Sequence, residues 1–356
     1  MFGKKHKARV ASNLIPDNSP LKTHKLSLII MGFLVLLTFF GGLVFGLYSF
    51  ANYKYEAKPK GEVRDIVFTV GKGNGLSTIA ANLESQGLID DAFLFKLITK
   101  LRGNEAKFKA GEFSVSYPAS MSKIYKTLSE GPSILYPFTA PEGLTSAQIM
   151  RLILSSETIT GDDPTLAEEG SLLPETYLLP RAMLASDLIK KMQKAQSEVL
   201  NELWETRQEG LPIKTKEEAI ILASIVEKET GLGGERDLVA GVFINRLNKG
   251  MRLESDPTII YGISKGEPLG RGLRRSEIDR KTDWNTYQIP RLPITPICNP
   301  GREAIAAVLN PAETEAIFFV ADGTGGHVFS KTLAEHNRNV VKWRKIERAR
   351  KRAKTP

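Results

Sequence analysis

The sequence has few of the residues that build metal sites and disulfide frameworks. Its 356 residues include one cysteine, Cys298, which excludes an internal disulfide framework and a cysteine-rich zinc site. Only two of its four histidines, His327 and His336, follow the long apolar run described below, and neither lies in an HxxxH or HExxH array. A GxxxxGKS or GxxxxGKT phosphate-binding motif is also missing. These absences argue against zinc hydrolysis and P-loop nucleotide chemistry, and we expect neither a metal nor a cofactor.

The net charge of +9 is confined to the two ends of the chain. Residues 1–25 carry six Lys or Arg and one acidic residue, and residues 342–356 carry eight and one. The 316 residues between them therefore have a net charge of −3. A nucleic-acid-binding protein usually has a basic stripe running through its fold. The sequence therefore gives no indication of a nucleic-acid partner.

A long uncharged segment predicts a membrane anchor. Residues 26–53 contain no charged side chain, and about 20 apolar residues suffice to cross the hydrocarbon core of a bilayer. The apolar core of a cleaved signal peptide is shorter, about 7–15 residues, although Ser49 and Ala51 leave cleavage open as an alternative. Because the basic residues crowd the N-terminal flank, we place residues 1–25 in the cytoplasm. The expected location is the cell inner membrane, with a single pass and the remaining chain, after residue 53, in the periplasm.

The part after the anchor reads as an α+β protein with more than one domain. Residues 63–134 predict a small module of strand, helix, helix and strand, with strands near 63–70 and 109–115. This order resembles a LysM-like carbohydrate-binding module, and a generic α+β adaptor is the alternative. We expect a mixed α+β domain at 135–343 and a basic tail at 344–356.

One carboxylate stands at the end of a helix that is apolar on nearly every side. Residues 219–226 are almost entirely apolar, so this helix is expected to be buried, and Glu227 follows directly. Burial raises the pKa of a carboxyl group, as a general acid at neutral pH requires. The small residues Ala223 and Ser224 lie one turn before Glu227 and leave room for a substrate.

The neighbouring Glu229 and a purely structural role for Glu227 are the alternatives to this assignment. Glu229 has larger side chains one turn before it, and Arg236 and Lys228 are placed to form a salt bridge with it. Glu227 itself is open to a structural interpretation, as an acid at a helix end that pairs with Arg246 or Arg236.

Several motifs in this half of the chain occur in a familiar order. They are Leu222–Thr230 (LASIVEKET), Val242–Leu247 (VFINRL), Ser255–Gly262 (SDPTIIYG), Asn285–Tyr287 (NTY) and Phe319–Phe329 (FVADGTGGHVF). Together they resemble the YceG-like family of endolytic murein transglycosylases. The resemblance implies one membrane span, a LysM-like subdomain and a catalytic domain outside the membrane, with the catalytic glutamate at Glu227. Glu175 and Glu254 stand where the family more often has Asp and Gln, so neither is assigned a catalytic role.

The resemblance also implies a reaction, a lytic, non-hydrolytic cleavage of peptidoglycan. Such an enzyme cuts the β-1,4 bond between N-acetylmuramic acid and N-acetylglucosamine within glycan strands and leaves 1,6-anhydro ends. It thereby limits or terminates elongation of nascent strands. Glu227 would protonate the leaving oxygen and then, as a carboxylate, remove the proton of the muramyl 6-hydroxyl group. A hydrolase usually needs a second carboxylate, and none is evident. The rival interpretations are a non-catalytic, membrane-anchored peptidoglycan-binding scaffold and a true hydrolase.

The remaining expected site residues concern substrate binding. Asn285, Thr286 and Tyr287 precede a proline-rich loop and are expected to bind sugar groups, and stabilising a turn is the alternative. We add Ser224 and Tyr261 to the substrate-binding set. The expected partners are peptidoglycan strands and the membrane, and family analogy suggests peptidoglycan synthases.

Two other residues have structural explanations. Asp256 precedes Pro257, a pairing typical of a helix N-cap with proline at the first helical position. His327 is expected to pack at a hairpin rather than to titrate in catalysis.

Overall fold

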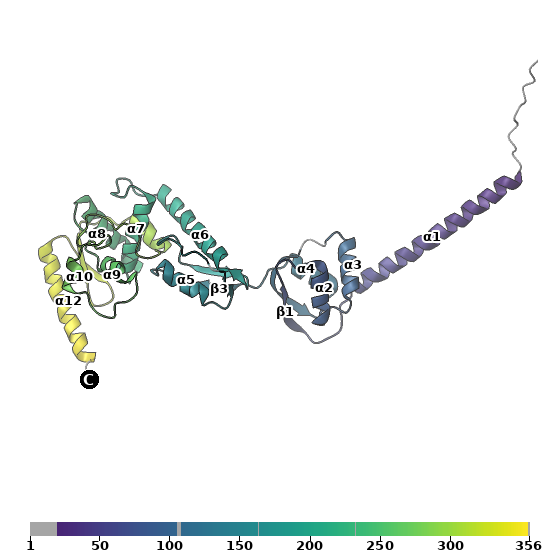
Figure 1. Ribbon diagram of the computed structural model, residues 1–356, viewed down its shortest axis with the longest axis horizontal. Helices are drawn as coiled ribbons and strands as arrows, with labels where there is room; N and C mark the ends of the chain where they lie inside the picture. Colours follow the sequence, from purple (N-terminus) through teal and green to yellow (C-terminus); the bar gives the residue numbers. More distant parts are fainter. Residues whose placement is uncertain (1–19, 105–107, 163, 232, 355–356) are drawn as a thin grey trace, which may run out of the picture. The chain divides into compact units, whose positions relative to one another are not determined.

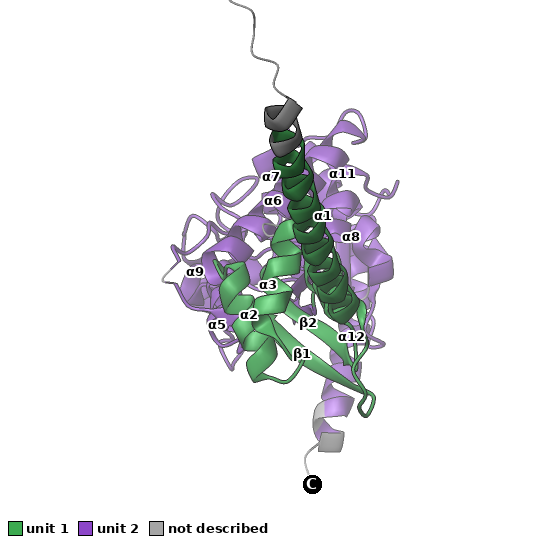
Figure 2. Cartoon of the chain, turned by 90° about the vertical axis from the view of Figure 1, so that its right-hand side faces the viewer, with its two compact units in different colours: residues 1–133 green, residues 134–356 purple. Residues whose placement is uncertain are grey.

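The structure is a computed structural model that describes residues 20–104, 108–162, 164–231 and 233–354. The chain divides into two compact units, Met1–Ser133 and Ile134–Pro356, which are coloured separately in Figure 2. Both units combine helices with short strands, so the expected α+β class is confirmed. Each unit is described below by itself.

The first unit begins with one long helix, α1 (Pro20–Glu56), drawn in purple in Figure 1. Within its segment Leu26–Glu56, the most apolar 18-residue window has a mean hydropathy of 2.6, and no part of that window is buried. It is long and apolar enough to cross a membrane, a property that a membrane anchor and an N-terminal signal sequence share. Residues 1–19 of the expected cytoplasmic segment 1–25 lie outside the described residues.

The rest of the first unit follows the expected order of strand, helix, helix and strand. Strands β1 (Arg64–Val70) and β2 (Gly111–Tyr117) pair antiparallel, with Phe68 opposite Phe113. Between them come α2 (Leu76–Ser85) and α3 (Ala92–Leu101), and α4 (Met121–Ser129) follows β2 with Ser120 as its N-cap. The alternation of the strands turns Phe68, Val70, Phe113 and Val115 toward the helices, where all four are buried.

Helix α1 is built into the core of this unit through its last turn. Tyr55 is 1% exposed and stacks on Phe95 of α3, with ring centroids 6.0 Å apart. Arg102, at the end of α3, bonds to Asn52 Oδ1 at 2.8 Å and to Glu56 Oε1 at 2.9 Å. Since α1 continues without a break from its uncharged part to Glu56, the apolar segment and the small module are joined by a helix and not by a flexible linker.

The second unit contains two groups of elements. The first group is β3 (Tyr136–Thr139), α5 (Ser146–Leu154), β4 (Ile159–Thr160), β5 (Thr176–Leu179), β6 (Met183–Leu184) and α6 (Ala185–Glu205). The second is α7 (Lys216–Glu229), a 3-10 turn (Gly233–Glu235), α8 (Arg236–Asn248), α9 (Asp256–Ser264), α10 (Arg275–Asp279), α11 (Arg302–Leu309), β7 (Phe318–Ala321), β8 (His327–Ser330) and α12 (Leu333–Lys354). The basic tail expected at 344–356 continues α12 to Lys354, and residues 355–356 lie outside the described residues.

Helix α7 lies at the centre of the second unit. Thr215 caps it by accepting a hydrogen bond from the Glu218 backbone, and residues 219–227 are all buried. A helix that is apolar on every side must be covered all round, and α8, α9 and α11 pack against it. Short strand pairs lie outside this bundle, β3 with β5 and β7 with β8, both antiparallel. This packing fixes the position of both carboxylates at the end of α7.

The junction between α1 and the first unit predicts a contrast between two neighbouring tyrosines. Tyr55→Ala removes a buried aromatic side chain and is expected to destabilise the unit by about 3–5 kcal/mol. Tyr53 is 71% exposed, so Tyr53→Ala is expected to stay within about 0.5 kcal/mol of wild type. Hydrogen exchange of the β1 and β2 amides, in the full chain reconstituted in lipid, measures the difference. Equal protection in the two variants would contradict the account of α1.

Candidate active site

Glu227 is buried in an ion-pair network. Its side chain is 6% exposed, and Arg236 Nη2 donates to Glu227 Oε1 at 3.4 Å. The same guanidinium contacts Glu142 at 3.0 Å and Glu303 at 2.7 Å. Of the two pairings considered for Glu227, the one with Arg236 is observed. The expected salt bridge between Glu229 and Arg236 is wrong, because the guanidinium is held by these other carboxylates.

A backbone group completes the surroundings of Glu227. The Gly301 N–H, at the start of α11, donates to Glu227 Oε2 at 3.0 Å. A side chain at Gly301 would meet the carboxyl end of the Glu142 side chain, which would have to shift. Burial raises the pKa of Glu227, while Gly301 and Arg236 act in the opposite direction by stabilising the carboxylate.

Glu229, the last residue of α7, lies in a different environment. Ser255 Oγ donates to Glu229 Oε1 at 2.6 Å. Burial raises the pKa of Glu229 first, and the negative charge of Asp256 raises it further, while the Ser255 hydrogen bond lowers it. Among the described residues, no Lys or Arg forms a salt bridge with Glu229. The nearby His327 also acts to lower the pKa of Glu229, and the net direction is a raised pKa.

Glu229 lines a cavity of about 400 Å³, which we call the Glu229 cavity. Its other lining residues come from five segments of the second unit and are Arg246, Leu253, Glu254, Asp256, Tyr287, Phe318, Phe319, Leu333, His336 and Asn337. Polar and aromatic side chains therefore surround the carboxyl group.

Hydrogen bonds hold the polar walls of the Glu229 cavity in place. Tyr287 Oη donates to Asp256 Oδ1 at 2.8 Å, and Arg246 Nη1 bonds to Glu254 Oε2 at 3.0 Å. Arg246 also donates to the backbone oxygens of Arg252 and Leu253, at 3.0 and 3.1 Å. The loop that carries Glu254 is thereby fixed against α8.

Asp256 has a different role from the one expected. Ser255, not Asp256, is the N-cap residue of α9, and Asp256 is already helical. The N-cap expectation is therefore wrong by one residue, because proline follows at the next position and the helix begins one residue earlier than the pairing suggests. This shift leaves the Asp256 carboxylate free to accept from Tyr287 and to line the cavity.

Of the five expected substrate-binding residues, Tyr287 alone lines the Glu229 cavity. The side-chain nitrogen of Asn285 donates to backbone oxygens of Ile278 and Arg280, at 2.9 and 2.6 Å, and its side-chain oxygen accepts from Tyr287 N at 3.0 Å. Thr286 Oγ1 accepts from Ser255 N at 2.9 Å. Asn285 and Thr286 are 1% and 0% exposed, so both shape the walls from behind.

Ser224 and Tyr261 lie farther into the fold. Ser224 is fully buried and accepts from the Ile297 N–H at 3.0 Å. Tyr261 Oη donates to Glu169 Oε2 at 3.1 Å, and burial raises the pKa of Glu169. The substrate-binding roles of Asn285, Thr286, Ser224 and Tyr261 stay predictions, and their side chains have internal partners.

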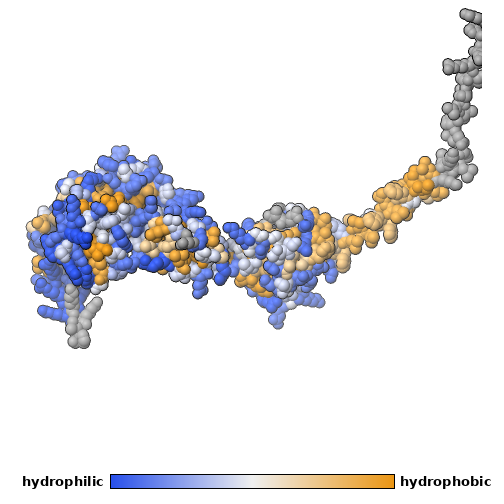
Figure 3. All heavy atoms as spheres, in the orientation of Figure 1, coloured by the Kyte–Doolittle hydropathy of each residue, from blue (hydrophilic) through white to orange (hydrophobic). Residues whose placement is uncertain are grey.

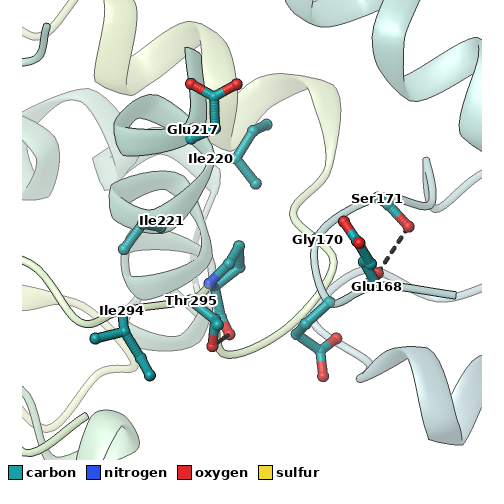
Figure 4. A pocket seen from close by; sticks show the side chains of 10 residues that line it. Glu168, Gly170, Ser171, Glu217, Ile220, Ile221, Ile294 and Thr295 are labelled. Atoms are coloured by element: carbon teal, nitrogen blue, oxygen red, sulfur yellow. Dashed lines mark hydrogen bonds between the residues drawn. The ribbon is translucent and has the colours of Figure 1, made fainter. Parts of the chain in front are cut away.

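A second cavity, of about 580 Å³, lies along the first half of α7 (Figure 4). Figure 4 shows Glu217, Ile220 and Ile221 of α7 on one side and the loop Glu168–Ser171 on the other. Ser171 Oγ donates to the backbone oxygen of Glu168 at 2.7 Å. Neither Glu227 nor Glu229 lines this cavity, so it does not share the candidate acid.

The sequence interpretation passed over Glu229 and Asp256 as site residues. Glu227 and Glu229 are two positions apart on a helix of 3.6 residues per turn, so they point in nearly opposite directions, about 200° apart. The small residues one turn before Glu227 and the family resemblance favoured Glu227 in the sequence analysis. The available signal was the pair Ser255 and Asp256, whose polar groups face the end of α7.

Three carboxyl groups line the cavity, those of Glu229, Glu254 and Asp256, and no metal centre is evident among the described residues. Within the described ranges, no group of three or more His, Cys, Asp or Glu side chains is placed to hold a metal ion. Burial lowers the pKa of His336, which lines the same cavity and stacks on Phe318 with ring centroids 5.0 Å apart. The class of protein that this fold and site define is an α+β protein with one buried acid in a polar cavity.

The chain belongs to the YceG-like family, whose sequence model matches residues 68–342. A Streptococcus pneumoniae protein named endolytic murein transglycosylase is 29% identical over 77% of this chain. The match spans 58% of the length of that relative. A Bacillus subtilis protein of the same name is 27% identical, over 85% of this chain and 91% of its own. The crystal structure of a yceG-like protein from Listeria monocytogenes is 27% identical, with a TM-score of 0.48, over 78% of this chain and 99% of that one.

The surroundings of Glu229 predict opposite pKa changes in two variants. Asp256→Asn removes a negative charge and keeps an oxygen for Tyr287, so the pKa of Glu229 is expected to fall. Ser255→Ala removes a hydrogen bond that stabilises the carboxylate, so this pKa is expected to rise. Carbon-13 NMR titration of the side-chain carboxyl groups, assigned with Glu229→Gln, measures both changes. Shifts of the same sign would contradict the described electrostatics.

Proposed function

We propose that this chain is a membrane-anchored peptidoglycan lytic transglycosylase. In this proposal it cuts the bond between N-acetylmuramic acid and N-acetylglucosamine within glycan strands and leaves 1,6-anhydro ends. The observation that carries the proposal is the carboxyl group of Glu229, which lines a polar cavity and, among the described residues, forms no salt bridge with a Lys or Arg. Family membership and the printed names of the two relatives support the same activity.

A single acid suffices for this reaction. The protonated carboxyl group donates its proton to the glycosidic oxygen, and the bond from that oxygen to muramyl C1 breaks. The resulting carboxylate then accepts the proton of the muramyl 6-hydroxyl group as its oxygen bonds to C1, which closes the anhydro ring. No water is consumed, and the carboxyl group ends as it began. A raised pKa suits the first step, because the acid must carry its proton at neutral pH.

The geometry favours Glu229 over Glu227 as this acid. Glu229 lines the cavity and is partly exposed to it, while Glu227 is enclosed by Arg236, Gly301 and the end of α7. Burial raises the pKa of both acids, and the Arg236 guanidinium counteracts part of this rise at Glu227. The sequence assignment of Glu227 stays a prediction, and the geometry gives Glu227 the role of joining α7, α8 and the start of α11.

Other parts of the chain have supporting roles in the proposal. Tyr287 and Asp256 are the residues best placed to contact the sugar beside Glu229, because both line the cavity. The first unit would act as a LysM-like glycan-binding module, which its strand–helix–helix–strand order supports. Helix α1 would span the membrane, with both units on the outer side, in a periplasm where one exists. Cleavage there would limit the length of nascent strands, and peptidoglycan synthases would be neighbours in the same membrane.

The proposal predicts a sharp difference between two isosteric variants. Glu229→Gln removes the proton donor and is expected to lower the rate of strand cleavage by about 100-fold to 10,000-fold, the usual contribution of a general acid. Glu227 does not line the Glu229 cavity, and glutamine has nearly the same shape as glutamate. Glu227→Gln is therefore expected to retain most activity. Full-length proteins in detergent are incubated with purified peptidoglycan, and mass spectrometry identifies the product ends. Thermal unfolding of each variant controls for misfolding.

Each result of this experiment has a definite meaning. Anhydro-muramyl ends from wild type support the transglycosylase, and reducing ends, heavier by one water, would replace it by a hydrolase. Without any products from a folded wild-type chain, the protein would be a peptidoglycan-binding scaffold. Loss of activity in Glu227→Gln with activity retained in Glu229→Gln would return the catalytic role to Glu227.

A further inference from the structure

Helix α3 of the first unit has an apolar stripe on its outer face. Phe93, Leu97 and Leu101 are spaced four residues apart and are 69%, 39% and 60% exposed. On the opposite face, Phe95, Ile98 and Thr99 are buried in the core of the unit. The three side chains of the stripe therefore do not pack in the core. Exposing three large apolar side chains to solvent on one short helix is unfavourable unless another surface covers them.

The apolar stripe continues the apolar surface of α1. Figure 3 shows apolar residues along α1 and on the adjoining edge of the first unit, where Figure 1 places α3. The two helices contact each other through Tyr55 and Phe95. On α1, Phe50 and Tyr53 are 61% and 71% exposed. The exposed apolar side chains of the two helices thus belong to one region of the unit.

The height of α3 along α1 is fixed by hydrogen bonds. Arg102, which follows Leu101, bonds to Asn52 Oδ1, and Asn52 belongs to the uncharged run 26–53. That run has 28 residues, and about 20 span the hydrocarbon core, so its last residues stand at the level of the lipid headgroups. The C-terminal end of α3 therefore lies at the same level. Lys96, on the flank of the stripe, suits contact with anionic headgroups.

We propose that α3 is an interfacial helix, whose stripe Phe93–Leu97–Leu101 inserts into the outer leaflet of the bilayer that α1 spans. Interfacial helices bury an apolar face about 5–10 Å into the headgroup region. The inference rests on the proposed membrane anchoring by α1. It adds that the first unit lies on the membrane surface in one orientation, held by α1 and α3 together, and does not stand away from it. The module then meets glycan strands close to the membrane.

Fluorescent labels at single introduced cysteines test the proposal in the full chain. The native Cys298 is fully buried, so a polar maleimide dye reacts with an introduced, exposed cysteine. Leu97→Cys reports the stripe, and Val67→Cys, at a 55% exposed apolar residue of β1, is the matched control. Leu36→Cys reports the middle of α1. The proteins are reconstituted in vesicles of phosphatidylglycerol and phosphatidylethanolamine, with nitroxide-labelled lipid or aqueous iodide as quencher.

We expect the label at position 97 to emit at shorter wavelength than the label at position 67. We also expect nitroxide-labelled lipid, and not iodide, to quench it. If the label at 36 is quenched by lipid while 97 behaves like 67, α3 does not insert, and the anchoring proposal stands alone. A label at 97 that is shielded from both quenchers would show a protein surface over the stripe and overturn the proposal. If lipid does not quench the label at position 36, both the membrane anchor and the interfacial helix are contradicted.

Discussion

The ion pair between Arg236 and Glu227 decides the chemistry that the second unit can offer. Helix α7 ends in two carboxylates that point away from each other. Arg236 pairs with Glu227, Glu142 and Glu303, and among the described residues no Lys or Arg forms a salt bridge with Glu229. Burial raises the pKa of both acids, and of the two only Glu229 lines the Glu229 cavity, with Tyr287 and Asp256 in its walls. In the proposed function, this separation gives Glu227 a structural role and Glu229 the catalytic one.

The first unit gains its functional meaning from the continuity of α1. Helix α1 carries the apolar segment directly into the module core through Tyr55, so an α1 that spans a membrane, as proposed, would transmit its orientation to the module. The exposed stripe on α3 extends the same logic, since a second contact with lipid would remove the remaining freedom of rotation about α1. The buried Tyr55 junction and the exposed stripe on α3 would have no use if a flexible linker joined α1 to the module. In the proposed function they keep glycan binding near the membrane.

Local features were predictable from the sequence, and tertiary neighbours were not. Helix α7, its Thr215 cap, the order of elements in the first unit and the helix from Ser120 follow from apolar spacing and capping residues close in sequence. The choice between Glu227 and Glu229 depended on Arg236, Gly301 and Ser255, which arrive from other segments. Asn285 and Thr286 were predicted to bind substrate, and their burial and internal hydrogen bonds could be known only from the packed loop. The predicted N-cap of α9, Asp256, lies one residue after the observed N-cap, Ser255, a difference within the usual uncertainty of a helix end.

The central claim is that Glu229 supplies the proton, so the pH dependence of cleavage must follow the titration of this one group. The direct measurement is the pH profile of kcat/KM for strand cleavage, compared with the NMR-determined pKa of Glu229, in wild type and in Ser255→Ala. Because the protonated acid is the active form, the rate should fall as pH rises through the Glu229 pKa, and in Ser255→Ala this fall should move to higher pH together with the pKa. An alkaline fall that stays in place while the pKa of Glu229 moves would contradict the account.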